Sequence, residues 1–469
     1  MVKIYNSLTK EKQKFEPIQK EVVKMYTCGV TVYDDCHIGH ARSLCVFDVI
    51  RRYLEFRGYE VNFIRNITDI DDKIINRANK LEVSWKDLSG KYIKRYRKDL
   101  ERLELKPVVF EPKATENIEA MIDYIKRLID KGYAYATDTG VYFEVRKFKQ
   151  YGKLSGQKID DMRLSVRIES DENKRDPLDF VLWKMVKESK PGWDSPWGRG
   201  RPGWHIECSV MSQKYLGTDT LDIHGGGRDL IFPHHENEIA QTESLSGKSF
   251  ANYWLHHGLL TFNLQKMSKS LGNFVKIAQV LEKYSADALK LFYFQAHYSS
   301  SIDFSWQNLE EAKKAYEHIK ILKEKLDNYL TGKNLNKKLA SGAGSSYQEY
   351  KEKFIKVMDD DFNMPRGLAV LFDLISKANG ELISNDKNKD KKLAGYKLAL
   401  DQITGVFGFS FSKKKLTGIS KDEIDKLIAL RNQYRKKKQF DKSDQIRNQL
   451  LTKGIVLEDT KEKTIWRRK

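Results

Sequence analysis

The stretch VVKMYTCGVTVYDDCHIGHARSLCVFDVIRRYLEFRGYEVNFIR, residues 22–65, carries the pattern of a complete βαβ unit. Residues 22–27 are a short apolar run of strand character, and apolar residues then recur at helical spacing from Ile38 until Gly58 ends the helix. Residues 60–65 are predicted to form a second strand. Because a crossover helix places the strands on either side of it parallel in one sheet, the stretch predicts a doubly wound, Rossmann-like α/β fold.

The sequence beyond this unit predicts that the α/β domain is split by an insertion. A helical pattern at 115–132 and a β-rich run after it lead into loop-like sequence up to about residue 200. A strand at 220–224, a glycine turn at 225–227 and a helix at 233–246 resume the domain.

The C-terminal half is predicted to be mainly helical. The helical pattern starts after residue 285 and is interrupted by a Gly/Ser-rich linker at about 341–346. Two short strands at 455–457 and 464–466 complete a small mixed module at the end of the chain.

Length and composition predict a large globular protein. With 469 residues, the chain is too long for one ordinary core, and 40% of its residues are apolar at a mean hydropathy of −0.61. No window approaches the roughly 18 apolar residues of a membrane helix, and the first twenty residues are charged. Four cysteines, Cys28, Cys36, Cys45 and Cys208, are too few for a disulfide framework. We therefore expect a cytoplasmic protein that has no membrane association.

The positive charge is concentrated near the C-terminus. The formal net charge is +19, and residues 411–469 contain 18 Lys and Arg against 8 Asp and Glu, a difference of +10. This excess indicates a surface for a polyanion such as RNA. Charge alone is equally compatible with solvated, lysine-rich faces.

His37-Ile38-Gly39-His40 lies where the first predicted strand meets the following helix. A helix N-terminus at this edge of a parallel sheet presents amide groups to an anion, so a phosphate can bind there. Two imidazoles three residues apart can donate to oxygens that gain charge in phosphoryl or adenylyl transfer. Taken alone, the motif favours a simple helix cap over catalysis.

A second motif, Lys266-Met267-Ser268-Lys269-Ser270, lies in a loop flanked by Gly and Asn. Two lysines in such a loop can close on a triphosphate and neutralise its charge, although the loop alone is equally compatible with an exposed basic segment. Together, and more than 200 residues apart, the two motifs resemble the signatures of the class I aminoacyl-tRNA synthetases. Because both motifs occur in one chain, this resemblance explains them better than coincidence does.

Cysteine, histidine and glutamate residues supply a candidate metal site. Thiolate, imidazole and carboxylate groups are the ligands that Zn²⁺ takes. His234 and Glu238 are four residues apart and share one helix face, whereas His235 is predicted to pack inward and, with Glu236, to be only a neighbour. A lone cysteine such as Cys28 or Cys208 is usually a small core residue.

Longer blocks of the sequence resemble the cysteinyl-tRNA synthetases. The blocks are residues 27–34, 65–73, 203–208, 224–238, 358–363 and 457–468. The resemblance implies that Cys28, Cys208, His234 and Glu238 bind one Zn²⁺ per chain. Zinc binds a thiol as thiolate, while the hydroxyl of serine stays protonated, so such a site would select cysteine without an editing domain.

The resemblance also implies substrates, partners and site residues. The substrates are L-cysteine, ATP with Mg²⁺, and the tRNA for cysteine, and we expect a monomer. The implied catalytic residues are His37, His40, Lys266 and Lys269. ATP is expected to contact His37, Gly39, His40, Gly225, Gly226, Gly227, Asp229 and Lys269. Cysteine is expected to contact Gly29, Thr68, Trp204 and His224. The tRNA is expected to contact Arg431, Arg435, Trp466 and Arg468. Trp204 is also compatible with a plain core position.

The sequence patterns and the resemblance together predict six segments. They are the two halves of the catalytic domain at 1–115 and 201–270, a connective insertion at 116–200, a lysine-loop and stem-contact region at 271–310, a helical bundle at 311–404 and an anticodon-binding module at 405–469. Two other functions remain open: a ligase that joins cysteine to an amino sugar in mycothiol synthesis, and a zinc-stabilised RNA-binding protein without catalysis. The basic C-terminal module disfavours the first, and the two nucleotide motifs disfavour the second.

Overall fold

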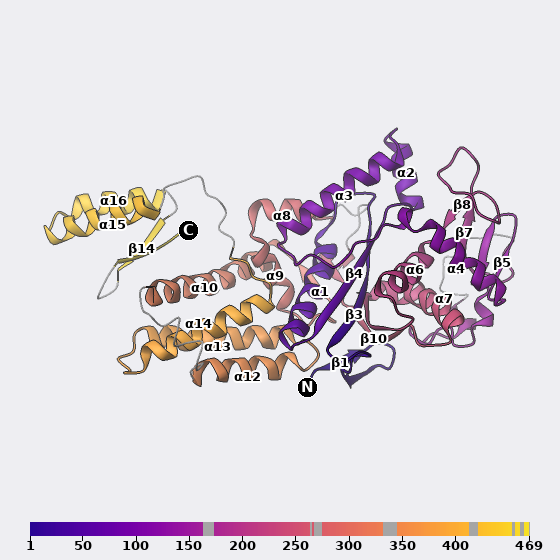
Figure 1. Cartoon of the computed structure of the whole chain (residues 1–469). Coiled ribbons are helices and arrows are strands. Elements are labelled where there is room, and N and C mark those ends of the chain that lie inside the picture. Colours follow the sequence, from indigo (N-terminus) through magenta and orange to yellow (C-terminus); the bar gives the residue numbers. More distant parts are fainter. Residues whose placement is uncertain are drawn as a thin grey trace.

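The computed structural model describes residues 1–162, 173–262, 265–266, 274–331, 345–411, 421–452, 455–459 and 464–468 (Figure 1). Its central sheet has four parallel strands in the order β10 (Ala251–His257), β9 (Leu221–Gly227), β3 (Val22–Thr31) and β4 (Glu60–Thr68). Helix α1 (Ile38–Phe56) connects β3 to β4. The predicted βαβ unit and the α/β fold class are therefore confirmed.

The two faces of this sheet belong to different cores. Met25 and Ile223 pair in register and lie in the same core cluster as the apolar side of α1. The next residues along these strands, Tyr26 and His224, also pair in register and belong to the opposite face, where Trp254 lies beside His224. Helices α6 (Trp204–Leu216) and α7 (Glu236–Ser246) pack against this second face.

The predicted glycine turn at 225–227 is wrong, because β9 runs through all three glycines and pairs with β10 as far as Gly227. The chain turns only in the short helical segments η3 (Arg228–Leu230) and η4 (Ile231–His235) that precede α7. A Cβ atom on Gly226 would lie 2.8 Å from Cε1 of His235. Close packing, and not a turn, therefore accounts for glycine at this position.

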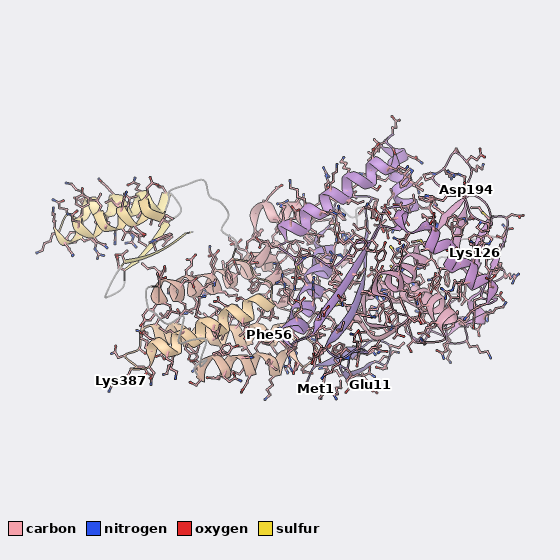
Figure 2. The ribbon with its side chains drawn as sticks, viewed as in Figure 1. Met1, Glu11, Phe56, Lys126, Asp194 and Lys387 are labelled. Carbon is pink, nitrogen blue, oxygen red and sulfur yellow. The ribbon has the colours of Figure 1, made fainter. Side chains whose placement is uncertain are left out.

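The insertion is an antiparallel sheet with helices α4 and α5, and Lys126 and Asp194 mark it at one end of the molecule in Figure 2. Its elements are α4 (Ile118–Asp130), β5 (Ala134–Ala136), β6 (Gly140–Phe143), α5 (Ile159–Met162), β7 (Phe180–Met185) and β8 (Gly200–Pro202). The sequence between 144 and 200 was expected to be loop-like, and β7 corrects that expectation. Its buried Leu182 and Trp183 form the centre of the sheet.

Further elements surround the central sheet. They are β1 (Lys3–Asn6), β2 (Glu11–Lys14), α2 (Asp72–Lys80), α3 (Trp85–Arg102), β11 (Leu260–Phe262), β12 (Gln265–Lys266), α8 (Ile277–Lys283), α9 (Ala286–Phe294) and β13 (Ile302–Phe304). Strands β12, β11 and β13 form a separate small sheet.

A bundle of long helices follows, with Lys387 at its far end in Figure 2. The helices are α10 (Trp306–Leu330), α12 (Ser345–Met358), α13 (Met364–Leu382) and α14 (Lys389–Val406). The bundle shares one core with the α/β domain, and Phe407 and Phe409 are buried in that core. The C-terminal module therefore begins beyond these two residues and not at residue 405.

The C-terminal module has its own small core (Figure 1), and an ion pair of Lys325 Nζ with Glu458 Oε2 at 3.8 Å joins it to the bundle. It contains α15 (Lys421–Lys436), α16 (Phe440–Thr452) and the antiparallel strands β14 (Ile455–Asp459) and β15 (Thr464–Arg468). Both predicted strands are present. Across the described parts of the chain, none of the helices has the length and apolar character needed to cross a membrane.

Candidate functional site

The site begins at an irregularity near the C-terminal end of β3. The pairing of β3 with β4 shifts register between Thr27 and Val30, which leaves Cys28 and Gly29 in a bulge. A bulge turns a side chain away from the regular alternation of the strand. The amide of Gly29 donates to Oδ1 of Asn66 at 2.8 Å, and a Cβ atom on Gly29 would lie 1.5 Å from the Asn66 carbonyl oxygen. Glycine is required here by close approach of the two strands.

Helices α6 and α7 bring three further donor groups to Cys28. Cys208 in α6 places its Sγ 3.7 Å from Sγ of Cys28, and Glu238 in α7 places Oε1 3.5 Å from the same sulfur. His234 Nε2 lies 2.8 Å from Glu238 Oε1, as expected for residues one helical turn apart. One donor atom from each of the four residues lies within 4.8 Å of the others, and Cys208, His234 and Glu238 are buried.

The arrangement of these atoms fits one metal ion. Two sulfurs bound tetrahedrally to a single Zn²⁺ at about 2.3 Å would lie roughly 3.8 Å apart, close to the observed 3.7 Å. Nε2 of His234 lies 2.8 Å from Oε1 of Glu238, and both residues belong to the set whose donor atoms lie within 4.8 Å of one another. The cluster therefore fits a metal site.

The electrostatics of the cluster require a positive charge among its acidic groups. Burial opposes ionisation, but the contact with Cys28 and the nearby His234 bring the pKa of Cys208 down to about 7. Burial also opposes ionisation of Glu238. The pKa of this carboxyl is nevertheless held well below its usual value by His234, His224 and His235. A buried thiolate and carboxylate are stable together only beside a cation. A metal ion can supply that charge, and so can a protonated His234. Burial lowers the pKa of His234, but Glu238 and Cys208 raise it to about 10.

The predicted role of His235 as a neighbour needs refinement. Its Nε2 lies 3.3 Å from Cys28 Sγ, and Cys28, His224, His235 and Glu238 form a second set of donors that also lie within 4.8 Å of one another. Helix spacing could not decide which of His234 and His235 reaches the donor cluster, because both side chains are fully buried.

Histidines outside the predicted set hold the donors in place. Nδ1 of His205 lies 2.9 Å from Nδ1 of His234, and Nε2 of His256 lies 2.8 Å from Nδ1 of His235. His224 Nε2 lies 2.6 Å from Glu238 Oε2, which orients that carboxylate. Outer partners of this kind fix the tautomer and orientation of metal ligands. The sequence-based prediction gave no role to His205 or His256. The signal that could have drawn attention to them is the rarity of histidine, since the chain has only ten.

The residues predicted to contact cysteine surround this cluster. The ring of Trp204 stacks on His234 with centroids 4.0 Å apart. It is 37% exposed, so the alternative of a plain core residue is wrong. Thr68 is buried at the end of β4 and donates to Glu207 Oε2 at 2.6 Å. Trp204 and Glu207 line a cavity of about 280 Å³ between the cluster and the insertion.

The first nucleotide motif starts α1. Nδ1 of His37 accepts from the amide of Gly39 at 3.0 Å, and Nδ1 of His40 accepts from the amide of His37 at 3.2 Å. The two rings therefore cap the helix and lie 3.8 Å apart. Both capping contacts are made by the Nδ1 atoms of the rings.

The segment after the lysine loop packs against this motif. The amide of Ile38 donates to the carbonyl of Val275 at 3.0 Å, and the amide of Ile277 donates to the carbonyl of Cys36 at 3.1 Å. Phe274 lies edge-on to His37 at 5.0 Å. Lys269 and the side chain of Lys266 are outside the described residues, but the described flank of their loop lies at the first motif.

The glycines predicted to contact ATP end strand β9, and Gly225 packs against Phe47 of α1. Asp229 follows in the exposed turn beyond Gly227. These residues lie at the carboxyl edge of the parallel sheet, where ligands of doubly wound folds bind.

The predicted tRNA contacts divide into two kinds. Arg431 is 2% exposed and donates two hydrogen bonds to the Asp459 carboxylate, each at 2.8 Å, which corrects its assignment as a surface contact. Arg435 is exposed beside it and bonds the same carboxylate. Trp466 donates through Nε1 to Asp425 Oδ1 at 3.0 Å. The side chain of Arg468 is outside the described residues.

Models of known protein families match three parts of the chain. Residues 14–314 match the tRNA synthetases class I (C) catalytic domain, residues 353–412 match the DALR domain, and residues 420–467 match the cysteinyl-tRNA ligase anticodon binding domain. Among solved structures, methionyl-tRNA synthetase of Mycobacterium tuberculosis with methionyl-adenylate has a TM-score of 0.61 at 14% identity, covering 82% of this chain and 90% of its own. A leucyl-tRNA synthetase of Agrobacterium radiobacter in a ternary complex with tRNA has a TM-score of 0.64 at 10% identity, covering 84% and 85%. These two structural similarities show that the chain shares the fold of both synthetases.

Curated relatives cover the chain from end to end. The cysteine–tRNA ligase of Thermodesulfovibrio yellowstonii is 48% identical over 99% of this chain and 99% of its own length. The cysteine–tRNA ligase of Clostridioides difficile is 47% identical over the whole of both chains. The chain therefore belongs to the cysteine–tRNA ligase family of class I aminoacyl-tRNA synthetases.

Proposed function

We propose that this chain uses ATP to activate L-cysteine as cysteinyl-adenylate, releasing pyrophosphate. It then transfers the cysteinyl group to the 3′ end of the tRNA for cysteine, releasing AMP. The observation that carries the proposal is the donor cluster of Cys28, Cys208, His234 and Glu238 at the carboxyl edge of the same sheet that carries the His37–His40 motif. An amino-acid site and a nucleotide site on one sheet edge suit adenylate formation.

The metal proposed for the cluster is Zn²⁺, one per chain, held by these four residues. When bound, it supplies a Lewis acid that takes the substrate thiol as thiolate and discriminates against the hydroxyl of serine. Trp204 closes one side of the cavity beside His234, and Thr68, Gly29 and His224 hold the surrounding shell through their contacts with Glu207, Asn66 and Glu238. Selection would then need only the cysteine site itself.

Adenylate formation is assigned to the two nucleotide motifs. The cysteine carboxylate attacks the α-phosphorus of ATP, and the bond from that phosphorus to the bridging oxygen breaks to release pyrophosphate. His37, His40, Lys266 and Lys269 stabilise the charge on the displaced phosphates, and Mg²⁺ accompanies ATP. Gly39, the β9 glycines and Asp229 are proposed to contact the remainder of the nucleotide, because backbone can approach it closely there.

Binding of tRNA is assigned to the C-terminal module and the basic surface around it. Arg435, Trp466 and Arg468 remain the proposed contacts, whereas Arg431 supports the module internally. The proposed working form is a cytoplasmic monomer.

Two assays in sequence test the function. Cysteine-dependent exchange of pyrophosphate into ATP is expected, with serine giving a much lower rate. Charging of the cysteine tRNA is then expected in the presence of the same components. Exchange without charging would instead favour a ligase with another acceptor, such as an amino sugar, and the absence of both activities would favour an RNA-binding protein. The match of residues 420–467 to an anticodon binding domain supports the tRNA acceptor.

A further inference from the structure

The exposed face of helix α3 carries a row of basic side chains with no acid between them. Between residues 91 and 98 the three residues that are not basic, Tyr92, Ile93 and Tyr96, are all buried. The exposed residues of this stretch form the basic row: Lys91, Lys94, Arg95, Arg97 and Lys98. Like charges three and four residues apart lower the stability of a helix. Folding alone therefore does not account for this row.

A basic face that is merely solvated is built differently in this protein. On helix α10, Lys313, Lys320 and Lys323 each form an ion pair with an acid three or four residues away on the same helix. In the basic row, ion pairing within the described part of the chain is limited to Arg95, which binds Asp35 at 2.7 Å. The other four cations are left for a partner that carries negative charge.

The basic row lies beside the first nucleotide motif. Asp35, the partner of Arg95, precedes His37 by two residues, and its other carboxylate oxygen binds Nζ of Lys276 at 2.8 Å in the segment after the lysine loop. Helix α3 follows β4 and α2 in the chain and packs against α2 and α8 (Figure 1). A polyanion bound along the row therefore reaches the edge of the sheet where the amino-acid and nucleotide sites lie.

We propose that the basic row binds backbone phosphates in the acceptor arm of the tRNA. The inference rests on the function proposed above, because the 3′ end must reach the adenylate at this edge for the cysteinyl group to be transferred. Residues 91–98 extend about 10 Å along the helix, enough for roughly three phosphates of one strand at about 3.4 Å per step. Contacts to phosphates orient an RNA without reading its sequence.

The test removes three members of the row together, in the triple variant Lys91→Ala, Lys94→Ala, Lys98→Ala of the full chain. Its affinity for a cysteine tRNA transcript, measured by filter binding, is expected to fall roughly 10-fold or more in dilute salt. The slope of log affinity against log salt concentration is expected to become shallower by about 3, one for each phosphate contact. Cysteine-dependent pyrophosphate exchange uses no tRNA, so its rate is expected to stay within twofold of wild type.

The matched control is the triple variant Lys377→Ala, Lys387→Ala, Lys391→Ala. It removes the same charge from exposed positions in the bundle, where Lys387 marks the far end (Figure 2). It is expected to keep the affinity and the salt dependence of wild type. Equal loss of affinity in the two triple variants would assign the effect to net charge and overturn the proposal.

A transcript that lacks the acceptor arm is the second probe, and it is expected to bind wild type and the α3 variant equally. A defect that persists with this probe would overturn the assignment to the acceptor arm. Unchanged affinity for the complete transcript would overturn the surface itself, as would a loss of pyrophosphate exchange in parallel with binding. If wild type charges no tRNA, the proposed function fails; if it does, and the α3 variant binds tRNA normally, only the basic row loses its role.

Discussion

The sulfur atoms of Cys28 and Cys208 lie 3.7 Å apart, although 180 residues separate them in the sequence. Both cysteines are free thiols, and the distance is that between two ligands of one tetrahedral ion. The bulge in β3 and the first turns of α6 hold the two sulfurs at this separation.

Replacing Cys28 by Ser is therefore expected to lower zinc affinity on the order of 100-fold or more. Even the loss of a residue that only hydrogen-bonds a metal ligand lowers metal affinity about 10- to 100-fold. The preference for cysteine over serine in pyrophosphate exchange is expected to fall with it. Metal content after dialysis and exchange rates with both amino acids check this. Cys45→Ala is the control, since Cys45 is buried in α1 away from the cluster. Full metal content and undiminished selectivity in Cys28→Ser would contradict the assignment.

Replacing Lys269 by Ala is expected to slow pyrophosphate exchange by about 100- to 1,000-fold, the usual effect of removing one group that stabilises transition-state charge. The concentration of cysteine giving half-maximal rate is expected to change little, because the contact proposed for this lysine is with phosphate and not with the amino acid. Steady-state exchange at varied cysteine and ATP separates the two effects. Lys248→Ala is a control for charge alone, since Lys248 is exposed at the far end of α7. An unchanged exchange rate would remove Lys269 from the mechanism.

The βαβ unit could be predicted because its information is local. The helical spacing after Ile38 and the apolar strands around it depend on neighbours in the sequence. Strand β7 was missed, because Phe180 to Met185 lies in polar surroundings and is buried only by strands paired from both sides.

The errors in the site have the same origin. Gly226 was expected in a turn, and its small size is instead required by His235, a contact made through the tertiary fold. His205 and His256 act through imidazoles 29 and 21 residues away, which no periodicity reveals. Helix spacing selected His234 and Glu238, but their link to Cys28 and Cys208 was available only through family resemblance, since the two cysteines meet across the domain.

Truncations on either side of Phe407 are expected to differ sharply. A chain ending at Phe411 keeps Phe407 and Phe409 in the main core and is expected to retain pyrophosphate exchange while charging tRNA poorly. A chain ending at Thr404 loses both rings, at a cost of roughly 3 kcal/mol or more for each. It also removes the Gly408 carbonyl that accepts from the buried Lys290 at 2.6 Å.

Melting temperature and exchange activity of the two truncated chains provide the test. The Thr404 truncation is expected to lose both, and the Phe411 truncation neither. Equal loss of exchange in the two chains would show that the C-terminal module contributes to adenylate formation, which this division of roles does not allow.

Arg431 and Asp459 join α15 to β14 and are expected to make the module sensitive to acid. Hydrogen bonds from Arg431 hold the pKa of the Asp459 carboxyl well below its usual value. A carboxyl whose pKa is lower in the folded state stabilises that state fully above its unfolded pKa of about 3.9 and loses this contribution as pH falls through the lower folded value. Amide hydrogen exchange in α15 and α16 of the full chain is therefore expected to show decreasing protection below about pH 4.

Arg431→Ala is expected to remove that acid dependence and to lower the stability of the module by about 2 kcal/mol at neutral pH, through loss of a bidentate charged hydrogen bond. Arg435→Ala is the matched control on the same helix. Arg435 is exposed and bonds Asp459 through a single contact, so its loss is expected to leave protection nearly unchanged and to weaken only tRNA charging. If Arg431→Ala kept full protection while charging fell as in Arg435→Ala, Arg431 would be a tRNA contact, and its buried pairing with Asp459 would not be what holds the module together.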